Sequence, residues 1–127
     1  MSKNIWGPKQ EGKDGVMSQD DFVAFVIAKV GDGGKIWQKN VEKAFEAISN
    51  HDGQSGANDK YPHKGKSVCH VSEGKRGAGN GVCVFFTAQG EVVASVIGIG
   101  YHIGSSSYKL EWQLATWDTG GTSDISL

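Results

Sequence analysis

Hydrophobic residues gather in one long stretch, residues 81–117, which holds half of the aromatic side chains and many of the β-branched ones. Gln89-Gly90 and the run from Gly104 to Ser107 interrupt this stretch, and both are typical of turns between strands. The pattern therefore predicts three antiparallel strands, at residues 82–88, 91–103 and 108–117. A fourth strand at residues 67–72 is expected to pair with the first of them across the loop 73–80.

Two helices are predicted ahead of these strands. Ser18 at an N-cap, acidic residues in the first turn and Gly31 at the end define the first helix. Residues 35–49 form the second, because their apolar side chains recur at helical spacing. Those positions are Trp37, Val41, Ala44, Phe45 and Ile48. We therefore expect an α+β fold in which two N-terminal helices pack on a four-stranded antiparallel β-meander.

The length of 127 residues indicates one domain, at residues 18–117, with an N-terminal arm at 1–17 and a flexible C-terminal tail at 118–127. The net charge of -1 excludes a general attraction to nucleic acid or membrane, so such binding needs a local patch. Neither a membrane-spanning run nor the apolar core of a signal peptide is evident. We expect a protein without membrane contact, cytoplasmic or secreted as part of a larger carrier without its own signal peptide. The oligomeric state stays open.

The strand register predicts a polar patch. If residues 104–107 form the turn, His102 faces Lys109 and Gly98 faces Gln113. One face of the hairpin is then apolar, and the other carries four polar side chains beside two glycines. These residues are His102, Lys109, Glu111, Gln113, Gly98 and Gly100. Glycines in a strand suggest close approach of a ligand or of another backbone. An ordinary solvated face with cross-strand ion pairs is the alternative.

The same outer face is more apolar at its other end than contact with water favours. Either a bulge interrupts the strand at 91–103, or the N-terminal arm or a second subunit covers this area. The sequence leaves these alternatives open.

A basic segment precedes the meander. Residues 59–76 contain five lysine and arginine residues and two acidic ones, a local charge of about +3. Lys75 and Arg76 lie in the glycine-rich run GKRGAGNG, where backbone N–H groups and side-chain charge can together bind a phosphate. The alternative is a solvated hairpin that is merely basic.

Cys69 and Cys83 fall in adjacent predicted strands, so we expect two buried thiols that serve as inert packing. No paired CxxC or HxxxH spacing accompanies them. The sequence therefore predicts no metal and no cofactor, and a cysteine hydrolase is set aside.

The polar face and the basic loop together supply the groups that metal-independent RNA cleavage needs. These are a base for the 2′-hydroxyl, an acid for the leaving 5′-oxygen, and cations for the phosphorane. The candidate catalytic residues are His102, Glu111, Lys109 and His70. The candidate substrate-binding residues are Lys75, Arg76, His63, Lys64, Ser106 and Ser107.

The order of two helices and a four-stranded meander with His, Lys, Glu and Ser on its open face resembles small bacterial ribonuclease toxin domains of the barnase, EndoU, colicin and RelE group. The resemblance is architectural and covers residues 18–117. It implies an endoribonuclease used in bacterial competition, with RNA as substrate and an immunity protein as partner. The alternative is a non-catalytic binding module, such as an immunity protein, an inhibitor or a ligand-binding domain, that uses exposed Trp6, Tyr61 and Trp117 as anchors.

Overall fold

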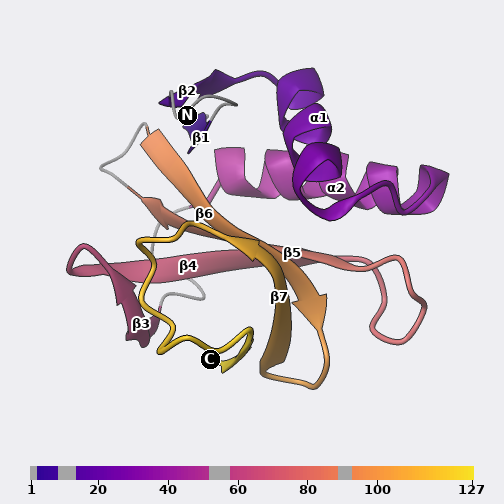
Figure 1. The fold of residues 1–127 in the computed structure, drawn as a ribbon. Coiled ribbons are helices and arrows are strands. Elements are labelled where there is room, and N and C mark those ends of the chain that lie inside the picture. The colour runs from indigo at the N-terminus through magenta and orange to yellow at the C-terminus, as the bar shows by residue number, and fades with distance from the viewer. Residues whose placement is uncertain (1–2, 9–13, 52–57, 89–92) are drawn as a thin grey trace.

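The computed structural model describes residues 3–8, 14–51, 58–88 and 93–127, and its architecture is α+β, as predicted (Figure 1). Two helices follow two short strands and precede the remaining strands. The elements are β1 (Asn4–Pro8), β2 (Asp14–Met17), α1 (Gln19–Val30), α2 (Lys35–Ser49), β3 (Asn58–His63), β4 (Lys66–Glu73), β5 (Val82–Ala88), β6 (Val93–His102), β7 (Ser107–Gln113) and β8 (Asp124–Ser126).

Both helices form where their local signals predict them. Ser18 caps α1, and its Oγ accepts a hydrogen bond from the backbone N–H of Asp21 at 3.2 Å. Gly31 ends α1 with a φ of 95°, a conformation that glycine adopts without steric cost. The helix α2 begins at Lys35 and ends at Ser49, and buries Trp37 and Ile48 among its apolar positions.

The sheet is larger than the predicted four-stranded antiparallel meander, which is wrong in detail. In the described parts of the chain eight strands form one mixed sheet, ordered β2-β1-β6-β5-β4-β3, with β7 pairing with both β6 and β8. The antiparallel run β4-β5-β6-β7 contains the predicted meander. The added strands come from the predicted arm (β1 and β2), the predicted loop (β3) and the predicted tail (β8), and β1 runs parallel to β6.

The sheet is buried on both faces, whereas the sequence predicted one apolar face and one polar face. The helices cover one face, and the C-terminal segment 114–127 covers part of the other (Figure 1). The core under the helices includes Phe22, Val26, Trp37, Val41, Ile48, Val84, Phe86, Val96 and Ile99. The opposite core consists of Val68, Cys83, Phe85, Ile97, Tyr108, Leu110, Trp117 and Ile125.

Two bulges, one in each central hairpin, explain why apolar residues of β6 and β7 that were predicted to share one face pack in both cores. Between β5 and β6 the register shifts after Phe85, so that Ile97 joins the core opposite the helices while Val96 and Ile99 lie under them. Of the alternatives left open for the strand at 91–103, the bulge is the one that forms, since it interrupts β6. The predicted arm contributes β1, which pairs with β6 as a neighbouring strand of the sheet.

The second bulge lies between β6 and β7 and corrects the predicted register. Gly98 pairs with Gln113 as predicted, but beyond the bulge His102 pairs with Tyr108, so the predicted pairing of His102 with Lys109 is wrong by one residue. The glycines in β6 serve close approach of protein groups. A Cβ at Gly100 would overlap the carbonyl oxygen of Lys109, and one at Gly98 would lie 2.6 Å from Cζ3 of Trp117.

Candidate functional site

A cleft of about 450 Å³ lies between the α1–α2 loop, the β4–β5 loop and the adjoining ends of β6 and β7. It brings together four of the predicted site residues, from segments far apart in the sequence. These are Lys75, Arg76, His102 and Glu111. The cleft is also lined by Glu73 and Tyr101, which the sequence did not single out. Their position at strand ends beside the glycine-rich loop and the hairpin turn was the available signal.

The glycine-rich β4–β5 loop is fixed at its base. Nδ2 of Asn40, on α2, donates a hydrogen bond to the carbonyl oxygen of Asn80 at 2.9 Å. Gly74 has a φ of 89°, and a Cβ there would lie 2.7 Å from the same Nδ2. The close contact between helix and loop therefore requires glycine at this point. Lys75 and Arg76 follow immediately and are exposed.

The carboxyl groups of the cleft differ in their surroundings. Oδ1 of Asp32 accepts hydrogen bonds from the backbone N–H of Gly34 at 2.9 Å and from Nε2 of Gln38 at 2.8 Å. The bond from Gly34, followed by that from Gln38, lowers the pKa of Asp32. Desolvation instead raises the pKa of Glu111, which sits at the bulge. Among the carboxyl groups of the cleft, Asp32 is thus a stabilised anion and Glu111 is one that binds a proton more readily.

His102 borders the cleft and is held at both ring nitrogens. Its Nδ1 lies 3.1 Å from the carbonyl oxygen of Gly104, and its Nε2 lies 3.0 Å from Oγ of Ser72. The ring also packs against Tyr108, with centroids 4.4 Å apart. Because a carbonyl oxygen only accepts, Nδ1 carries the hydrogen, and in the neutral ring Nε2 is then the acceptor. The fold thereby fixes one tautomer of His102.

His70 contacts the same tyrosine from the other side and does not line the cleft. Its Nε2 lies 3.0 Å from the hydroxyl oxygen of Tyr108, and its ring stacks on Phe85 with centroids 5.9 Å apart. The Tyr108 side chain is 3% exposed. His70 is therefore linked to His102 through this buried ring, and lies with the core opposite the helices.

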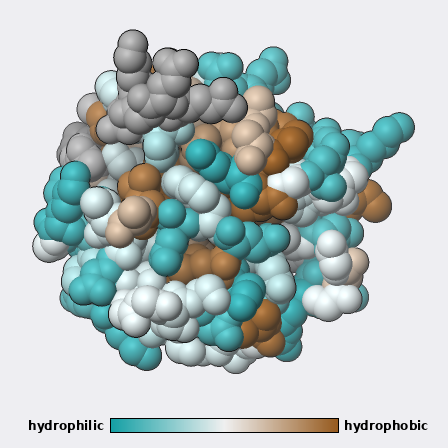
Figure 2. Space-filling model, viewed as in Figure 1, coloured by the Kyte–Doolittle hydropathy of each residue, from teal (hydrophilic) through white to brown (hydrophobic). Residues whose placement is uncertain are grey.

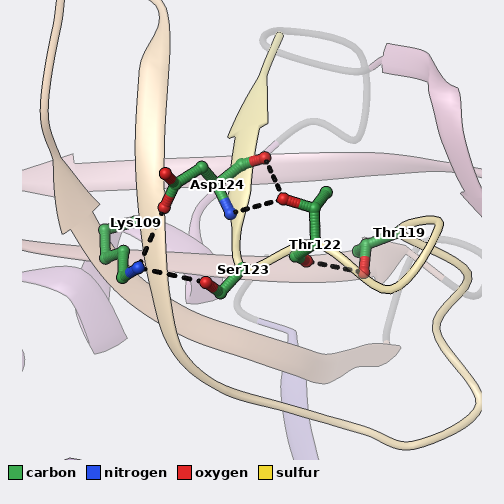
Figure 3. Close-up of polar contacts among 5 residues, drawn as sticks. All are labelled: Lys109, Thr119, Thr122, Ser123 and Asp124. Carbon is green, nitrogen blue, oxygen red and sulfur yellow. Dashed lines mark hydrogen bonds and ion pairs between the residues drawn. The ribbon is translucent and has the colours of Figure 1, made fainter.

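Lys109 lies apart from the cleft, against β8 (Figure 3). Its Nζ forms an ion pair with Oδ1 of Asp124 at 3.1 Å and donates a hydrogen bond to Oγ of Ser123 at 3.0 Å. Figure 3 also shows Thr122 and Thr119 bracing the segment before β8, with Oγ1 of Thr119 donating to the carbonyl oxygen of Thr122 at 3.0 Å. Lys109 therefore helps to hold the C-terminal strand on the sheet.

The remaining predicted substrate-binding residues lie away from Lys75 and Arg76. His63 and Lys64 line a second cavity of about 350 Å³, together with Trp6 and Leu114. His63 is 6% exposed, and desolvation, followed by the nearby charge of Lys64, lowers its pKa.

Ser106 and Ser107 face the C-terminus. The backbone N–H of Leu127 donates to the carbonyl oxygen of Ser106 at 2.9 Å, and Oγ of Ser107 lies 3.4 Å from Oγ of Ser126. The turn that carries these serines is therefore tied to the end of the chain.

Cys69 and Cys83 are both buried thiols, as predicted. Desolvation raises the pKa of Cys83 to about 11 although Ser72 lies within hydrogen-bond distance. Within the residues that the structure describes, no group of three or more His, Cys, Asp or Glu side chains is placed to hold a metal ion. The described helices include none long and apolar enough to cross a membrane.

No protein-family model, no curated protein and no solved structure matches this chain.

Proposed function

We propose that the chain is a metal-independent ribonuclease of the toxin-domain type, and that its RNA substrate binds in the cleft between the β4–β5 loop and the β6–β7 hairpin. One observation carries the proposal: His102, Glu111, whose pKa is raised, and the exposed Lys75 and Arg76 all line one cleft. This set supplies an acid, a base and charge for a phosphorane without a metal ion.

The tautomer of His102 and the surroundings of Glu111 favour one division of roles. Nε2 of His102 accepts a hydrogen bond, so it is the group that takes the proton of the 2′-hydroxyl as the 2′-oxygen attacks phosphorus. Glu111, whose pKa is raised by desolvation, gives a proton to the leaving 5′-oxygen. Lys75 and Arg76 balance the charge that grows on the phosphorane.

A second candidate is a protein-binding module. Tyr101 and Ile103 are 39% and 51% exposed, and Tyr101 lines the cleft, which favours contact with a partner at this rim. Of the aromatic anchors predicted for this function, Trp117 is buried, and its Nε1 donates to the carbonyl oxygen of Tyr61 at 2.9 Å. Figure 2 shows hydrophobic patches separated by hydrophilic residues on the face in view. In the toxin, an immunity protein would bind over this rim.

The test compares the wild type with His102→Ala, Glu111→Gln and the double variant Lys75→Ala/Arg76→Ala. Each is induced in a bacterial host, growth is scored, and the purified protein is incubated with RNA in the presence of EDTA. Loss of either acid–base group is expected to slow cleavage by about 10²- to 10⁴-fold. Lys64→Ala and Lys109→Ala are the matched controls, since each removes a cation outside the cleft, and their rates should stay within a few-fold of the wild type.

Intact RNA and normal growth with the wild type would overturn the ribonuclease proposal. If the wild type then binds a partner protein and Tyr101→Ala does not, the binding module is supported.

A further inference from the structure

Ser72 lies on β4, in a row of paired residues that runs across β4, β5 and β6. It pairs with Cys83 on β5, and Cys83 pairs in turn with Gly100 on β6, so the three positions form a row across the sheet. Ser72 is exposed to solvent, whereas Cys83 is 1% exposed. The Oγ of Ser72 is 3.0 Å from Nε2 of His102 and 3.0 Å from Sγ of Cys83.

The directions of these hydrogen bonds follow from what each group is able to donate. The carbonyl of Gly104 fixes the hydrogen of His102 on Nδ1, which leaves Nε2 as an acceptor. The hydroxyl of Ser72 therefore donates its hydrogen to Nε2. A hydroxyl has a single hydrogen, so the thiol of Cys83 is the donor toward Oγ of Ser72.

This arrangement contains a nucleophile, a base and a group that orients the base. A serine hydroxyl that donates to a neutral imidazole, whose other nitrogen is held by an acceptor, is the arrangement by which serine nucleophiles are activated. Cys83 does not compete for this role, because its thiol is buried and burial keeps it protonated. Of the three residues Ser72 alone is exposed, since His102 is half-buried and Cys83 is buried, so Oγ of Ser72 is the atom best placed to attack an electrophile.

We propose that Ser72 is an activated nucleophile, with His102 as its base, that accepts acyl groups from activated esters and phosphonyl groups from phosphonofluoridates. In the acyl reaction Oγ forms a bond to the carbonyl carbon, the ester C–O bond breaks, and the proton passes through Nε2 to the leaving alcohol. Water then cleaves the acyl-serine, releasing a carboxylic acid and restoring the hydroxyl. With a phosphonofluoridate the Oγ–P bond forms, fluoride leaves, and the proton stays on Nε2 until solvent removes it. This reactivity does not depend on RNA cleavage.

The experiment treats the full chain with a fluorophosphonate probe under native conditions and maps the adduct by peptide mass spectrometry. Ser72 should carry the adduct, and Ser106, an exposed serine in the nearby hairpin turn, serves as the comparison within the same molecule. Ser72 is expected to react at least about 10²-fold faster than Ser106, the size of a typical general-base contribution. Ser72→Ala should abolish the adduct, and Ser106→Ala should leave the labelling rate unchanged.

The role of the imidazole is tested with His102→Asn, whose folding is checked by circular dichroism. Labelling of Ser72 should slow by about 10²-fold in this variant. Equal labelling of Ser72 and Ser106 in the folded wild type would overturn the proposal without any variant. Unchanged labelling of Ser72 in a folded His102→Asn would overturn it as well.

Discussion

The bulge between β6 and β7 depends on the absence of a side chain at Gly100, so Gly100→Ala is a direct test of the architecture around the cleft. An added Cβ would overlap the carbonyl oxygen of Lys109, and would lie 2.8 Å from the carbonyl carbon of Lys109 and 3.1 Å from Cα of Leu110. These are backbone atoms, so no change of rotamer relieves the overlap. The two strands must separate at the point where the bulge places Glu111.

The cost can be approximated from the two effects of that separation. Inserting a methyl group into a packed site costs about 1 to 3 kcal/mol, and each weakened ladder hydrogen bond adds about 1 kcal/mol. Replacing glycine stiffens the unfolded chain and returns about 0.4 to 1 kcal/mol. The net loss of unfolding free energy is expected to be about 3 kcal/mol, which lowers Tm by roughly 10 °C for a chain of this size.

The matched control is Gly104→Ala, in the turn at the end of the same hairpin. A Cβ at Gly104 would lie 3.4 Å from Cβ of Ser107 and 3.5 Å from its Oγ, contacts close to ordinary van der Waals distances. Its stability should therefore stay within about 0.5 kcal/mol of the wild type. Both variants are compared by urea unfolding with tryptophan fluorescence. If Gly100→Ala is as stable as Gly104→Ala, the close approach of β7 to Gly100 is refuted, and so is the bulge that carries Glu111.

Three further predictions concern the thiol, the C-terminal cover and the surface ion pair. The pKa of Cys83 is raised from its ordinary value of 9.0 to about 11, so the unfolded chain loses this proton first and stability falls as pH rises from 9 to 11. Urea titrations across that range should show a loss about 2 kcal/mol larger in the wild type than in Cys83→Ala. Trp117→Phe removes the hydrogen bond to the carbonyl of Tyr61 and should cost about 1 to 2 kcal/mol in the same assay. Lys109→Ala breaks an ion pair whose side chains are 40% and 58% exposed, so calorimetry should show a loss of at most about 1 kcal/mol.

Local signals in the sequence were enough to predict the helices and the central strands. The cap at Ser18, the glycine at Gly31 and the apolar spacing of α2 are each determined within one or two turns of chain. The strand predicted at residues 82–88 forms with the same bounds, because its apolar run is continuous and buried on both faces. Such elements can be predicted because the residues that determine them lie within the element itself.

The strands that the sequence did not predict are short and gain their stability from distant partners. β8 spans Asp124–Ser126 and is held because Ile125 packs against the core opposite the helices and Lys109 binds Asp124. β1 joins the sheet through a parallel pairing with β6. Neither contact leaves a periodic pattern in the sequence, since only one or two side chains of each strand are buried.

The polar patch predicted on the hairpin was divided by the bulge. In the predicted register His102 and Glu111 share a face with Lys109, but in the structure Lys109 pairs with Asp124, while His102 and Glu111 both line the cleft. A one-residue shift moves a side chain to the opposite face of a sheet, and the sequence contains no direct signal for it apart from Gly100. A glycine at this position indicates close approach of another group, and in the structure that group is the backbone of β7.

The proposed ribonuclease and the proposed reactive serine depend on the same nitrogen atom. Nε2 of His102 is the base in both reactions, and Ser72 lies 3.0 Å from it. A phosphonyl group bound to Oγ of Ser72 would occupy the space beside Nε2 and take away the hydroxyl that contacts it. RNA cleavage should therefore fall in proportion to the fraction of Ser72 that is labelled, measured by intact mass and by the rate of RNA cleavage in the same samples. Ser72→Ala, which keeps Nε2 open, should retain cleavage after treatment with the probe. Full activity in completely labelled protein would show that RNA does not use this nitrogen, and the base would have to be sought at Glu73 or Glu111.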